Sequence, residues 1–425
     1  MLDPRTLAAR RDEIAESCRR RGVAVDLDAA IGHQERVAAL QTRLQDLYRQ
    51  RNEHQANGKR PLAVKERETH AAEGRRLKDE AARLEAEVAE ADTTLHALVA
   101  AIPNLVHPDV PTGGEADFRE LRRRGTPPAF GFRPLDHLAI AERLDLVDFD
   151  AGARVAGQKW YFLKNEAVLL ELALQRFALD VLLEAGFTPF VTPDVAKPEI
   201  LDGIGYNPRG PETQIYSIAN EDLCLVGTAE ITLGGLYKDE ILDEDVLPLR
   251  LAGLSHCFRT EAGAAGRESR GLYRVHQFSK VEMFALTRPE DSEAMHDELV
   301  AIEERIFEAL EIPYRVIDVA SGDLGAPAYR KFDLEAWMPG RGESGDWGEV
   351  TSASNCTDFQ ARRLGIRFRR KGGKRSEFVH TLNGTAVALS RAPIAILENH
   401  QREDGSVSIP KALRPYLGRD VIGPR

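Results

Sequence analysis

Two runs of apolar residues at heptad spacing, separated by a chain-reversing segment, constrain the fold of this chain more than any other feature. The first run repeats at spacings of three, four and three residues: Val37, Leu40, Leu44 and Leu47. The second run alternates spacings of four and three residues: Leu77, Ala81, Leu84, Val88, Ala91, Leu95 and Leu98. Between them, residues 57–61 (Asn-Gly-Lys-Arg-Pro) supply turn and helix-breaking residues. We therefore expect two helices folded back as an antiparallel coiled-coil hairpin, with arms of about 40–50 Å.

A coiled coil between two chains is the alternative, because heptads commonly serve dimerisation. The chain reversal favours a hairpin within one chain. Residues 36–76 hold ten Lys or Arg and five Asp or Glu, a net charge of +5 around the reversal. The pattern thus indicates an intramolecular arm whose basic tip contacts a partner.

The remainder of the chain has a different pattern. Residues 102–114 contain proline, asparagine and glycine and read as a linker, so we expect domains at 1–110 and 111–425. Beyond the linker, short strand-like runs mix with helical segments near 165–185 and 290–310; the runs are 190–191, 223–226, 314–319, 379–382 and 387–389. This mixture predicts an α+β domain with helices flanking an antiparallel β-sheet. Neither a P-loop nor a strand-GxGxxG-helix unit occurs, which disfavours those nucleotide-binding folds.

Composition narrows the setting of the protein. With 425 residues, 43% of them hydrophobic, the chain can bury a sizeable core. Its four cysteines form no CxxC pair or Cys/His cluster, so we expect neither disulfides nor a zinc site, and a reducing compartment is favoured. No apolar stretch approaches ~18 residues and no leader is apparent, which predicts a cytoplasmic protein without membrane contact. The formal net charge of −11 argues weakly against nucleic acid, but it conceals a second basic run at 362–375, with eight Lys or Arg and no acid.

Residues 258–282 (FRTEAGAAGRESRGLYRVHQFSKVE) have the pattern of a β-hairpin with a long tip. Side chains in a strand alternate between faces, so Arg259 and Glu261 share one face of the first strand. On one face of the second strand the alternation places Arg274, His276, Phe278 and Glu282. Two guanidiniums, an aromatic ring and two carboxylates suit a ligand with phosphates, a purine and an ammonium group. The alternative is a solvated charged face, and Lys280 is interpreted as an ordinary surface residue.

The same hairpin resembles motif 2 of class II aminoacyl-tRNA synthetases, and further segments resemble the seryl-tRNA synthetase family in the same order along the chain. Residues 227–230 (GTAE) resemble its serine-binding loop. Residues 349–355 (EVTSASN), followed by DFQARR at 358–363, resemble its metal segment. Residues 381–385 (TLNGT), running on to Arg391, resemble motif 3. The heptad hairpin corresponds to the tRNA-binding arm of that family.

This resemblance implies an ATP site that requires Mg²⁺. Arg259 would bind the α-phosphate, Glu261 the adenine amino group, and Phe278 would lie beneath the adenine ring. Arg274 and Arg391 would reach the outer phosphates, and Arg259 and Arg391 would be the catalytic residues. The segment Glu349, Val350, Thr351 and Ser352 would complete the nucleotide site, with Glu349 and Ser352 as the Mg²⁺ ligands, since hard oxygen ligands suit that ion.

The resemblance likewise implies a pocket for L-serine. Glu282 would hold the ammonium group, and Thr228, Ala229 and Glu230 would form the wall. Asn383 and Thr385 would sense the hydroxyl. Since a site built to hydrogen-bond a hydroxyl leaves its polar groups unpaired around an analogue lacking it, we expect alanine to be rejected strongly. Threonine must be excluded by size.

Several residues have a structural interpretation instead. We expect His256 and His276 to be structural histidines and Cys257 a buried small hydrophobic residue. The basic segment 367–375 has two interpretations of equal standing: contact with the tRNA acceptor end, or a solvated loop. Residues 340–348, rich in glycine, are predicted to form a surface loop.

Three positions depart from the family pattern. Thr351 and Thr385 stand where serine is common, and each keeps a hydroxyl group. Pro393 follows the motif 3 arginine closely. Inside a helix a proline costs ~3 kcal/mol, so we predict a helix that begins near Leu389 with Pro393 in its first turn.

The resemblance implies a serine–tRNA ligase that forms seryl-adenylate and charges tRNA(Ser), with tRNA(Sec) as a further candidate and no DNA partner. It also implies a homodimer, with motif 1 in the helix before Gly186 and the strand ending near Pro193. One alternative is a paralogue that delivers serine to a carrier protein or small molecule, but such chains lose the arm. The other alternative is a non-catalytic relative. It would be expected to lose Arg259, Glu282, Glu349 or Arg391, and all four are present.

Overall fold

Residues 1–61, 63–206, 214–262 and 271–424 are described by the computed structural model, and residues 263–270 of the expected hairpin tip lie outside them. The chain divides into two units, Met1–Leu105 and Val106–Arg425. The sequence places the boundary near residue 110, a few residues further along.

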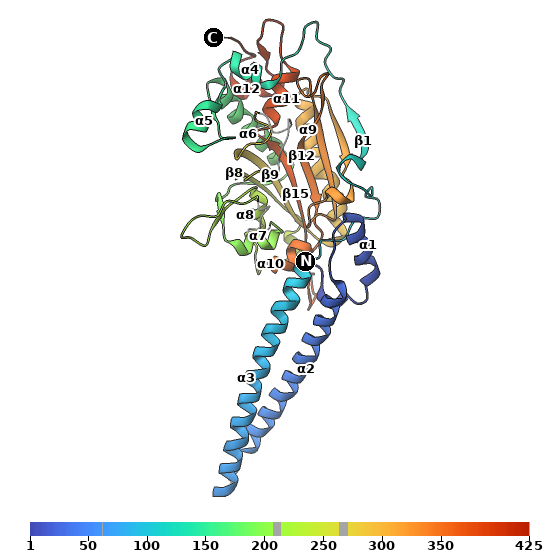
Figure 1. Cartoon of the computed structure of the whole chain (residues 1–425), viewed down its shortest axis with the longest axis vertical. Helices are drawn as coiled ribbons and strands as arrows, with labels where there is room; N and C mark the ends of the chain where they lie inside the picture. The colour runs from blue at the N-terminus through green and yellow to red at the C-terminus, as the bar shows by residue number, and fades with distance from the viewer. Residues whose placement is uncertain (62, 207–213, 263–270, 425) are drawn as a thin grey trace. The chain divides into compact units, whose positions relative to one another are not determined.

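The first unit is built on two long helices. After the short helix α1 (Arg11–Arg21), α2 (Leu27–Asn57) and α3 (Val64–Ala100) run antiparallel and pack on each other (Figure 1). Their heptad residues form the buried seam: Leu47, Leu77, Ala81 and Leu84 in one cluster, with Val37, Ala91 and Leu95 in another. The predicted coiled-coil hairpin within one chain is confirmed. At 1.5 Å per residue the helices are about 45 and 55 Å long.

The second unit is centred on an eight-stranded sheet with the strand order β1-β10-β11-β12-β15-β9-β8-β4. All neighbouring pairs are antiparallel except β4 and β8, so the predicted α+β class with a largely antiparallel sheet is confirmed. The strands are β1 (Arg119–Arg124), β4 (Thr188–Val191), β8 (Leu249–Phe258), β9 (Gln277–Thr287), β10 (Tyr314–Asp318), β11 (Arg330–Met338), β12 (Asp346–Asn355) and β15 (His380–Ala388).

The helices of this unit are α4 (His137–Arg143), α5 (Phe149–Ala156), α6 (Glu166–Glu184), α7 (Pro198–Ile204), α8 (Ala229–Gly235), α9 (Ser292–Ala309), α10 (Phe359–Leu364), α11 (Ala392–Asn399) and α12 (Arg414–Leu417). Short strands form smaller sheets: β2 (Val147–Asp148), β3 (Phe162–Leu163), β5 (Val195–Ala196), β6 (Cys224–Leu225), β7 (Ile241–Asp243), β13 (Arg367–Arg369), β14 (Ser376–Phe378), β16 (Val407–Ser408) and β17 (Val421–Ile422). Among the described residues, no helix is long and apolar enough to cross a membrane.

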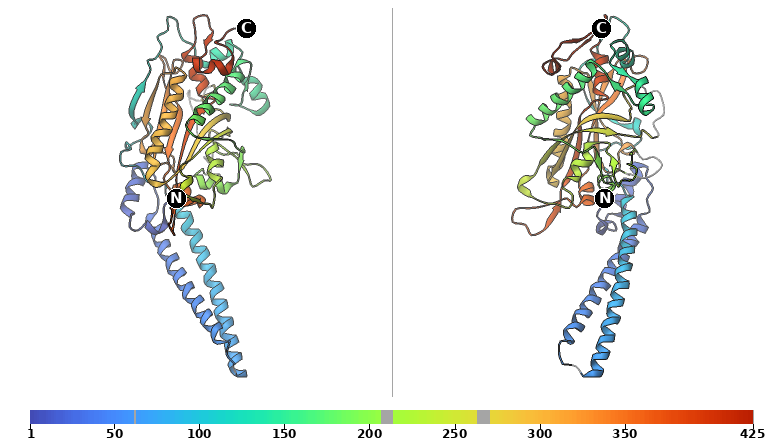
Figure 2. Two further views of the ribbon diagram at one scale, coloured as in Figure 1. Left: turned by 180° about the vertical axis from the view of Figure 1, so that it is seen from behind. Right: turned by 90° about the vertical axis from the view of Figure 1, so that its left-hand side faces the viewer.

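The alternation of side chains along β9 explains how the sheet separates its two faces. Val281, Met283 and Ala285 join the large core that includes residues of α6 and α9. Figure 2 shows α9 lying along the sheet strands, and α9 packs on β11, β12, β15 and β9. Phe284 and Leu286 point the other way, into a smaller core with residues of α7, α8 and α10. Lys280 and Glu282 share that second face, which carries the cavity described below.

Two expectations about strands need correction. The apolar runs 379–382 and 387–389 are not separate strands, since β15 spans both. The hairpin strands stop at Phe258 and Gln277, so Arg259, Glu261 and Arg274 lie beyond the paired strands. Glu261 has a φ of +51°, which turns the chain out of the extended conformation.

The helix after motif 3 begins at Ala392, three residues later than predicted. Pro393 does lie in its first turn, where its missing N–H has no partner to lose. Residues 339–345 form the loop between β11 and β12, whereas Trp347 and Gly348 of the expected loop are buried within β12.

Candidate active site

The polar side chains singled out in the sequence converge on one cavity of about 390 Å³ in the second unit. Strands β9, β11, β12 and β15 supply wall residues, and Glu230 of α8 and the segment after β8 contribute others. Of the predicted site residues, the cavity is lined by Arg259, Glu261, Phe278, Glu349, Val350, Thr351, Ser352, Arg391, Glu230, Glu282, Asn383 and Thr385. Segments more than 150 residues apart in the sequence therefore build one site.

Two arginines and aromatic rings occupy one part of the cavity. The Arg259 guanidinium lies 5.4 Å from the ring centre of Phe278, and its Nε donates to the carbonyl of Gly227 at 3.3 Å. The Arg391 guanidinium lies 4.7 Å from the ring centre of Tyr273. Planar guanidinium groups beside aromatic faces suit a ligand that combines phosphates with a flat ring.

Glu349 is the carboxylate beside these arginines. Its Oε1 lies 3.0 Å from Nη1 of Arg391, and its side chain keeps 40% exposure toward the cavity. Burial by itself would raise the pKa of Glu349, but the charges of Arg391, Lys331 and Arg259 bring it below the ordinary value. Glu349 is thus ionised at neutral pH. With the hydroxyl of Ser352, also in the cavity wall, it forms an all-oxygen donor set that fits Mg²⁺.

A second carboxylate, Glu282, is almost fully buried on the same wall. Its Oε2 lies 2.5 Å from Nζ of Lys280 and accepts a hydrogen bond from the hydroxyl of Thr385 at 3.4 Å. Burial raises the pKa of Glu282, and Lys280 and Arg259 oppose that rise. The pocket therefore contains a carboxylate able to accept from an ammonium group.

Glu230 enters the cavity from the start of α8. Its Oε1 accepts from Nε2 of Gln360 at 2.8 Å and from Nδ2 of Asn383 at 2.9 Å. Thr381 in turn donates to Oε1 of Gln360 at 2.6 Å, so the chain of hydrogen bonds reaches β15. Burial and the nearby charge of Glu282 raise the pKa of Glu230 to about 7. Glu230 thus takes up or loses a proton near neutral pH.

Comparison with known proteins agrees with this geometry. Residues 1–106 match the seryl-tRNA synthetase N-terminal domain, and residues 215–400 match the tRNA synthetase class II core domain (G, H, P, S and T). The chain is 54% identical to the serine–tRNA ligase of Treponema denticola, with 100% of both chains covered. It is 57% identical to that of Rhodopirellula baltica, with 99% of both covered.

The chain belongs to the seryl-tRNA synthetase family. The crystal structure of seryl-tRNA synthetase from Pyrococcus horikoshii complexed with ATP matches it with a TM-score of 0.91 at 39% identity, covering 100% of both chains. Residues from the segments that resemble motif 2, the metal segment and motif 3 of this family line the cavity, together with Glu230 of the serine loop.

Three residues predicted for the seryl-tRNA synthetase site stand apart from the cavity wall. Arg274 is 39% exposed, and its Nη1 lies 3.5 Å from Oε2 of Glu261. Thr228 is buried as the N-cap of α8, where its hydroxyl accepts from the N–H of Glu230 at 3.2 Å. Ala229 is fully buried. In this structure Thr228 caps the helix that carries Glu230.

Thr351 lines the cavity, yet its hydroxyl is directed to α9. It donates to Oε2 of Glu303 at 2.8 Å, and both residues are almost fully buried. Burial raises the pKa of Glu303 well above its ordinary value. Thr351 therefore contributes its hydroxyl to the packing of β12 on α9.

Sequence reasoning missed two charged or polar residues around Glu282 and Glu230. Lys280, interpreted as a surface residue, is only 5% exposed and lines the cavity. Gln360 is fully buried and holds Glu230. The period of two along β9 was a usable signal for Lys280, because it places Lys280 on the face of Phe278 and Glu282.

The residues expected to have a structural role, His256, His276 and Cys257, are held by contacts within the protein or by burial. Nδ1 of His276 lies 3.0 Å from the Tyr216 hydroxyl and 2.9 Å from the carbonyl of Arg259. His256 pairs with Asp194 at 2.8 Å. Cys257 is fully buried, and burial raises the pKa of its thiol.

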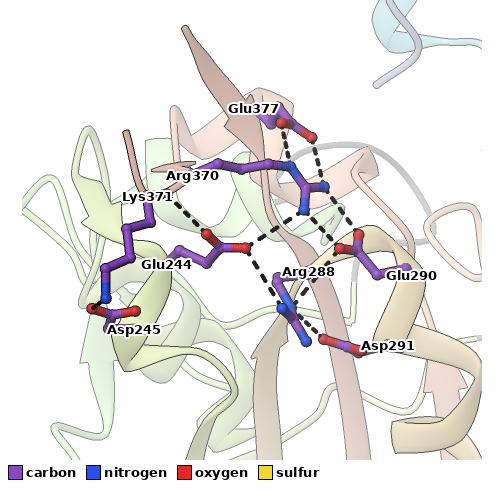
Figure 3. A network of polar contacts seen from close by, with 8 residues as sticks. All are labelled: Glu244, Asp245, Arg288, Glu290, Asp291, Arg370, Lys371 and Glu377. Carbon is purple, nitrogen blue, oxygen red and sulfur yellow. Dashed lines mark hydrogen bonds and ion pairs between the residues drawn. The ribbon is translucent and has the colours of Figure 1, made fainter. Parts of the chain in front are cut away.

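The basic run at 362–375 is neutralised in part by acids from the neighbouring strand β14 and from more distant segments. Arg370 forms ion pairs with Glu290 and Glu377 at 2.7 Å and lies 3.6 Å from Glu244 (Figure 3). The backbone N–H of Lys371 donates to Glu244 at 2.9 Å. Residues 367–369 of the segment 367–375 lie in the strand β13. The interpretation of this segment as a solvated loop therefore holds for only part of it. Contact with tRNA stays a prediction.

Proposed function

We propose that the chain activates L-serine with ATP, forming seryl-adenylate, and transfers serine to the 3′ end of tRNA(Ser). The observation that carries this proposal is the division of one cavity into two parts. Arg259, Arg391 and Phe278 form an environment for a nucleotide. Glu282 and Thr385 form one for a small amino acid that carries an ammonium group and a hydroxyl.

Adenylate formation needs alignment more than acid–base catalysis. The serine carboxylate is already ionised; one of its oxygens bonds to the α-phosphorus as the bond to pyrophosphate breaks. Arg259 would bind two oxygens of the α-phosphate and stabilise charge there, while Arg391 would hold the outer phosphates. Mg²⁺ bound by Glu349 and Ser352 would add positive charge beside the phosphate oxygens. Holding both reactants in line supplies much of the rate enhancement.

The amino-acid end supports serine as the substrate. Glu282 would accept from the ammonium group, and Thr385 and Asn383 lie on β15 beside it. Thr385 and Asn383 are already hydrogen-bonded to Glu282 and Glu230, so their positions are fixed before a ligand binds. Alanine has no hydroxyl group, so Thr385 and Asn383 would lose a hydrogen-bond partner. Alanine should therefore be a poor substrate.

For tRNA, the arm formed by α2 and α3 supports recognition by backbone and shape, because the base edges of A-form RNA are poorly accessible. Its basic charge predicts salt-sensitive binding. We extend the proposal to tRNA(Sec) as a second substrate, to a cytoplasmic location, and to the absence of a DNA partner.

Two assays on the purified protein test the proposal and its rivals: serine-dependent ATP–pyrophosphate exchange, and transfer of serine to tRNA(Ser). We expect both activities from the intact chain, and exchange alone from a variant in which a short linker replaces residues 30–100. If the intact chain shows no pyrophosphate exchange, the proposal that it is a serine-activating enzyme is ruled out. Exchange without charging of tRNA by the intact chain would favour the paralogue that serves a carrier.

We further propose a homodimer joined through α6 and β4, the elements that correspond to motif 1. Large apolar side chains are exposed there: Val168, Leu169, Leu172, Leu183 and Val191, with Leu172 at 55% and Val191 at 85%. Exposed large apolar side chains on two elements that pack together, as α6 and β4 do, are typical of an interface. Leu172→Glu should shift the mass measured by light scattering from dimer toward monomer. The control is Val155→Glu, an apolar position on α5 that is 74% exposed. Equal effects of both changes would contradict the proposed interface.

A further inference from the structure

Lys280 is a buried cation within the amino-acid end of the cavity. It stands two residues before Glu282 on β9, so the pleat of the strand puts both side chains on one face. Its side chain is 7% exposed and that of Glu282 is 3% exposed, and the two charged groups are 2.5 Å apart. A lysine ammonium is strongly hydrated, so this burial requires a compensating partner.

A purely structural ion pair is the simplest explanation, but its place in the molecule argues against it. Buried ion pairs are weak sources of stability, since desolvation offsets the attraction between the charges. This pair is not enclosed in an apolar core, because both residues line the cavity together with Glu230, Arg259 and Thr385. The position of this ion pair favours a role in binding a ligand of the cavity.

The two oxygens of Glu282 are unequally used. Nζ of Lys280 and the hydroxyl of Thr385 both contact Oε2. Within the part of the chain that the structure describes, no hydrogen bond from protein reaches Oε1. Lys280 thus fixes the carboxylate by one oxygen and leaves the other to accept from a ligand.

The charge of Lys280 also matters for the protonation of Glu282. Burial raises the pKa of Glu282, and the largest opposing influence is Lys280. Among the described residues, other titratable or charged groups that interact with Glu282 are Arg259 and Cys257 at and just after the end of β8, Glu230 on α8, Tyr206 after α7 and Glu303 on α9. Glu230 and Glu303 are carboxyl groups, so without Lys280 the balance shifts toward a protonated Glu282.

We propose that Lys280 is a positioning residue for the substrate's ammonium group: it holds Glu282 by Oε2, as a carboxylate, so that Oε1 is left to accept from serine. The inference rests on the proposed role of Glu282 in binding serine. Lys280 acts through Glu282, so its loss should weaken the use of serine and leave the use of ATP largely unchanged.

The test compares Lys280→Met, which removes the charge at similar length, with Lys280→Arg, which keeps it. Serine-dependent pyrophosphate exchange is measured between pH 6 and 9, with KM determined separately for serine and for ATP. We expect Lys280→Met to raise KM for serine at least tenfold at pH 7, more at pH 6 and less at pH 9, with KM for ATP changed less than twofold. Lys280→Arg should restore the pH profile of the unaltered chain.

Lys238→Met is the matched control, because Lys238 is also paired with acids but lies outside the cavity. A loss with Lys280→Met that is independent of pH, or equal for serine and ATP, would overturn the proposal. If Lys280→Met does not fold, Lys280→Gln gives the same comparison.

A double variant separates this inference from the proposed function. Once Glu282→Gln has removed the carboxylate, adding Lys280→Met should raise KM for serine less than twofold further. Independent, multiplicative losses would contradict the action of Lys280 through Glu282. If Glu282→Gln alone leaves KM for serine unchanged, the proposed role of Glu282 fails, whatever Lys280 does.

Discussion

Arg259 follows directly after β8, where the chain leaves the sheet, and its guanidinium lies over Phe278 in the wall of the cavity. The fork of a guanidinium can bind two phosphate oxygens at once, whereas the ammonium group of lysine is a point charge. Arg259→Lys should therefore keep the charge and lose the geometry.

We expect Arg259→Lys to lower kcat/KM for pyrophosphate exchange by about 10²–10³, the range for loss of one preorganised donor at a reacting centre. The melting temperature should be nearly unchanged. Arg154→Lys, on the surface of α5, is the control. Retention of more than a tenth of the activity by Arg259→Lys would contradict the assigned role.

Glu230 makes a prediction about stability. Its pKa is raised by burial and by Glu282 to about 7 in the folded chain, against 4.5 as the ordinary value. The folded state therefore binds more protons between these values, and stability falls as pH rises from about 4.5 through 7. Glu230→Gln removes this loss, so at pH 8 it should be more stable than the unaltered chain by about 3 kcal/mol, and equally stable below pH 4.5.

Urea unfolding at pH 4.5 and pH 8 measures this difference, with the exposed Glu221→Gln as the control. A stability change of equal size at both pH values would count against the raised pKa. The same variant should lose serine activation, because the carboxylate in the pocket is replaced by a neutral amide.

The pocket residues differ in how far the sequence could predict them. Arg259, Phe278 and Glu282 were accessible because hairpin periodicity and motif resemblance coincide there. Lys280 and Gln360 were not assigned, because burial of a charge or an amide depends on partners that arrive from other elements. The contact of the Thr351 hydroxyl with Glu303 is of the same kind, since α9 is some 50 residues away in the sequence.

Among the elements, the arm formed by α2 and α3 has the most direct relation between sequence and structure. A heptad seam is local, so its spacing alone predicts which side chains meet. Leu84 is 3% exposed in the middle of that seam.

Leu84→Ala should destabilise the arm by about 2–5 kcal/mol, the usual cost of removing a buried leucine side chain. We expect faster amide hydrogen exchange in α2 and α3 and a higher KM for tRNA, with serine-dependent pyrophosphate exchange unchanged. Glu87→Ala, exposed on the same helix, is the control. If hydrogen exchange rises while KM for tRNA stays constant, the arm does not bind tRNA in the proposed way.

Strand β15 shows why other elements were harder to predict. Its site-facing positions are polar, Asn383 and Thr385, and Gly384 lies between them, so the apolar pattern breaks where the strand crosses the cavity. A Cβ at Gly384 would come within 3.2 Å of Oε1 of Glu303, so this position favours the smallest residue. Residues required by the site thus interrupt the alternation of apolar and polar residues by which a strand is recognised in a sequence.

Across the whole molecule, folding brings together charges that are far apart in the sequence, so the local net charge of the surface differs from that of a sequence window. The basic run at 362–375 reads as a cationic segment, but three acids gather around Arg370: Glu377 of β14, Glu244 just after β7 and Glu290 shortly after β9. The net charge of a sequence window therefore overstated the positive surface there. By contrast, the predictions of the family, the fold class and the activity rested on several motifs that occur in the expected order along the chain. An error at one motif does not change those predictions.

The central claim is that this fold selects serine and joins it to tRNA(Ser). Its most direct test is the charging of a tRNA(Ser) transcript with ATP, Mg²⁺ and, in separate reactions, serine, threonine, alanine or glycine. We predict stoichiometric charging with serine and, at equal concentration, rates for alanine and glycine at least 10³-fold lower, as expected when hydroxyl-binding groups are left unpaired. Absence of seryl-tRNA, or charging with alanine at a rate near that with serine, would contradict the account.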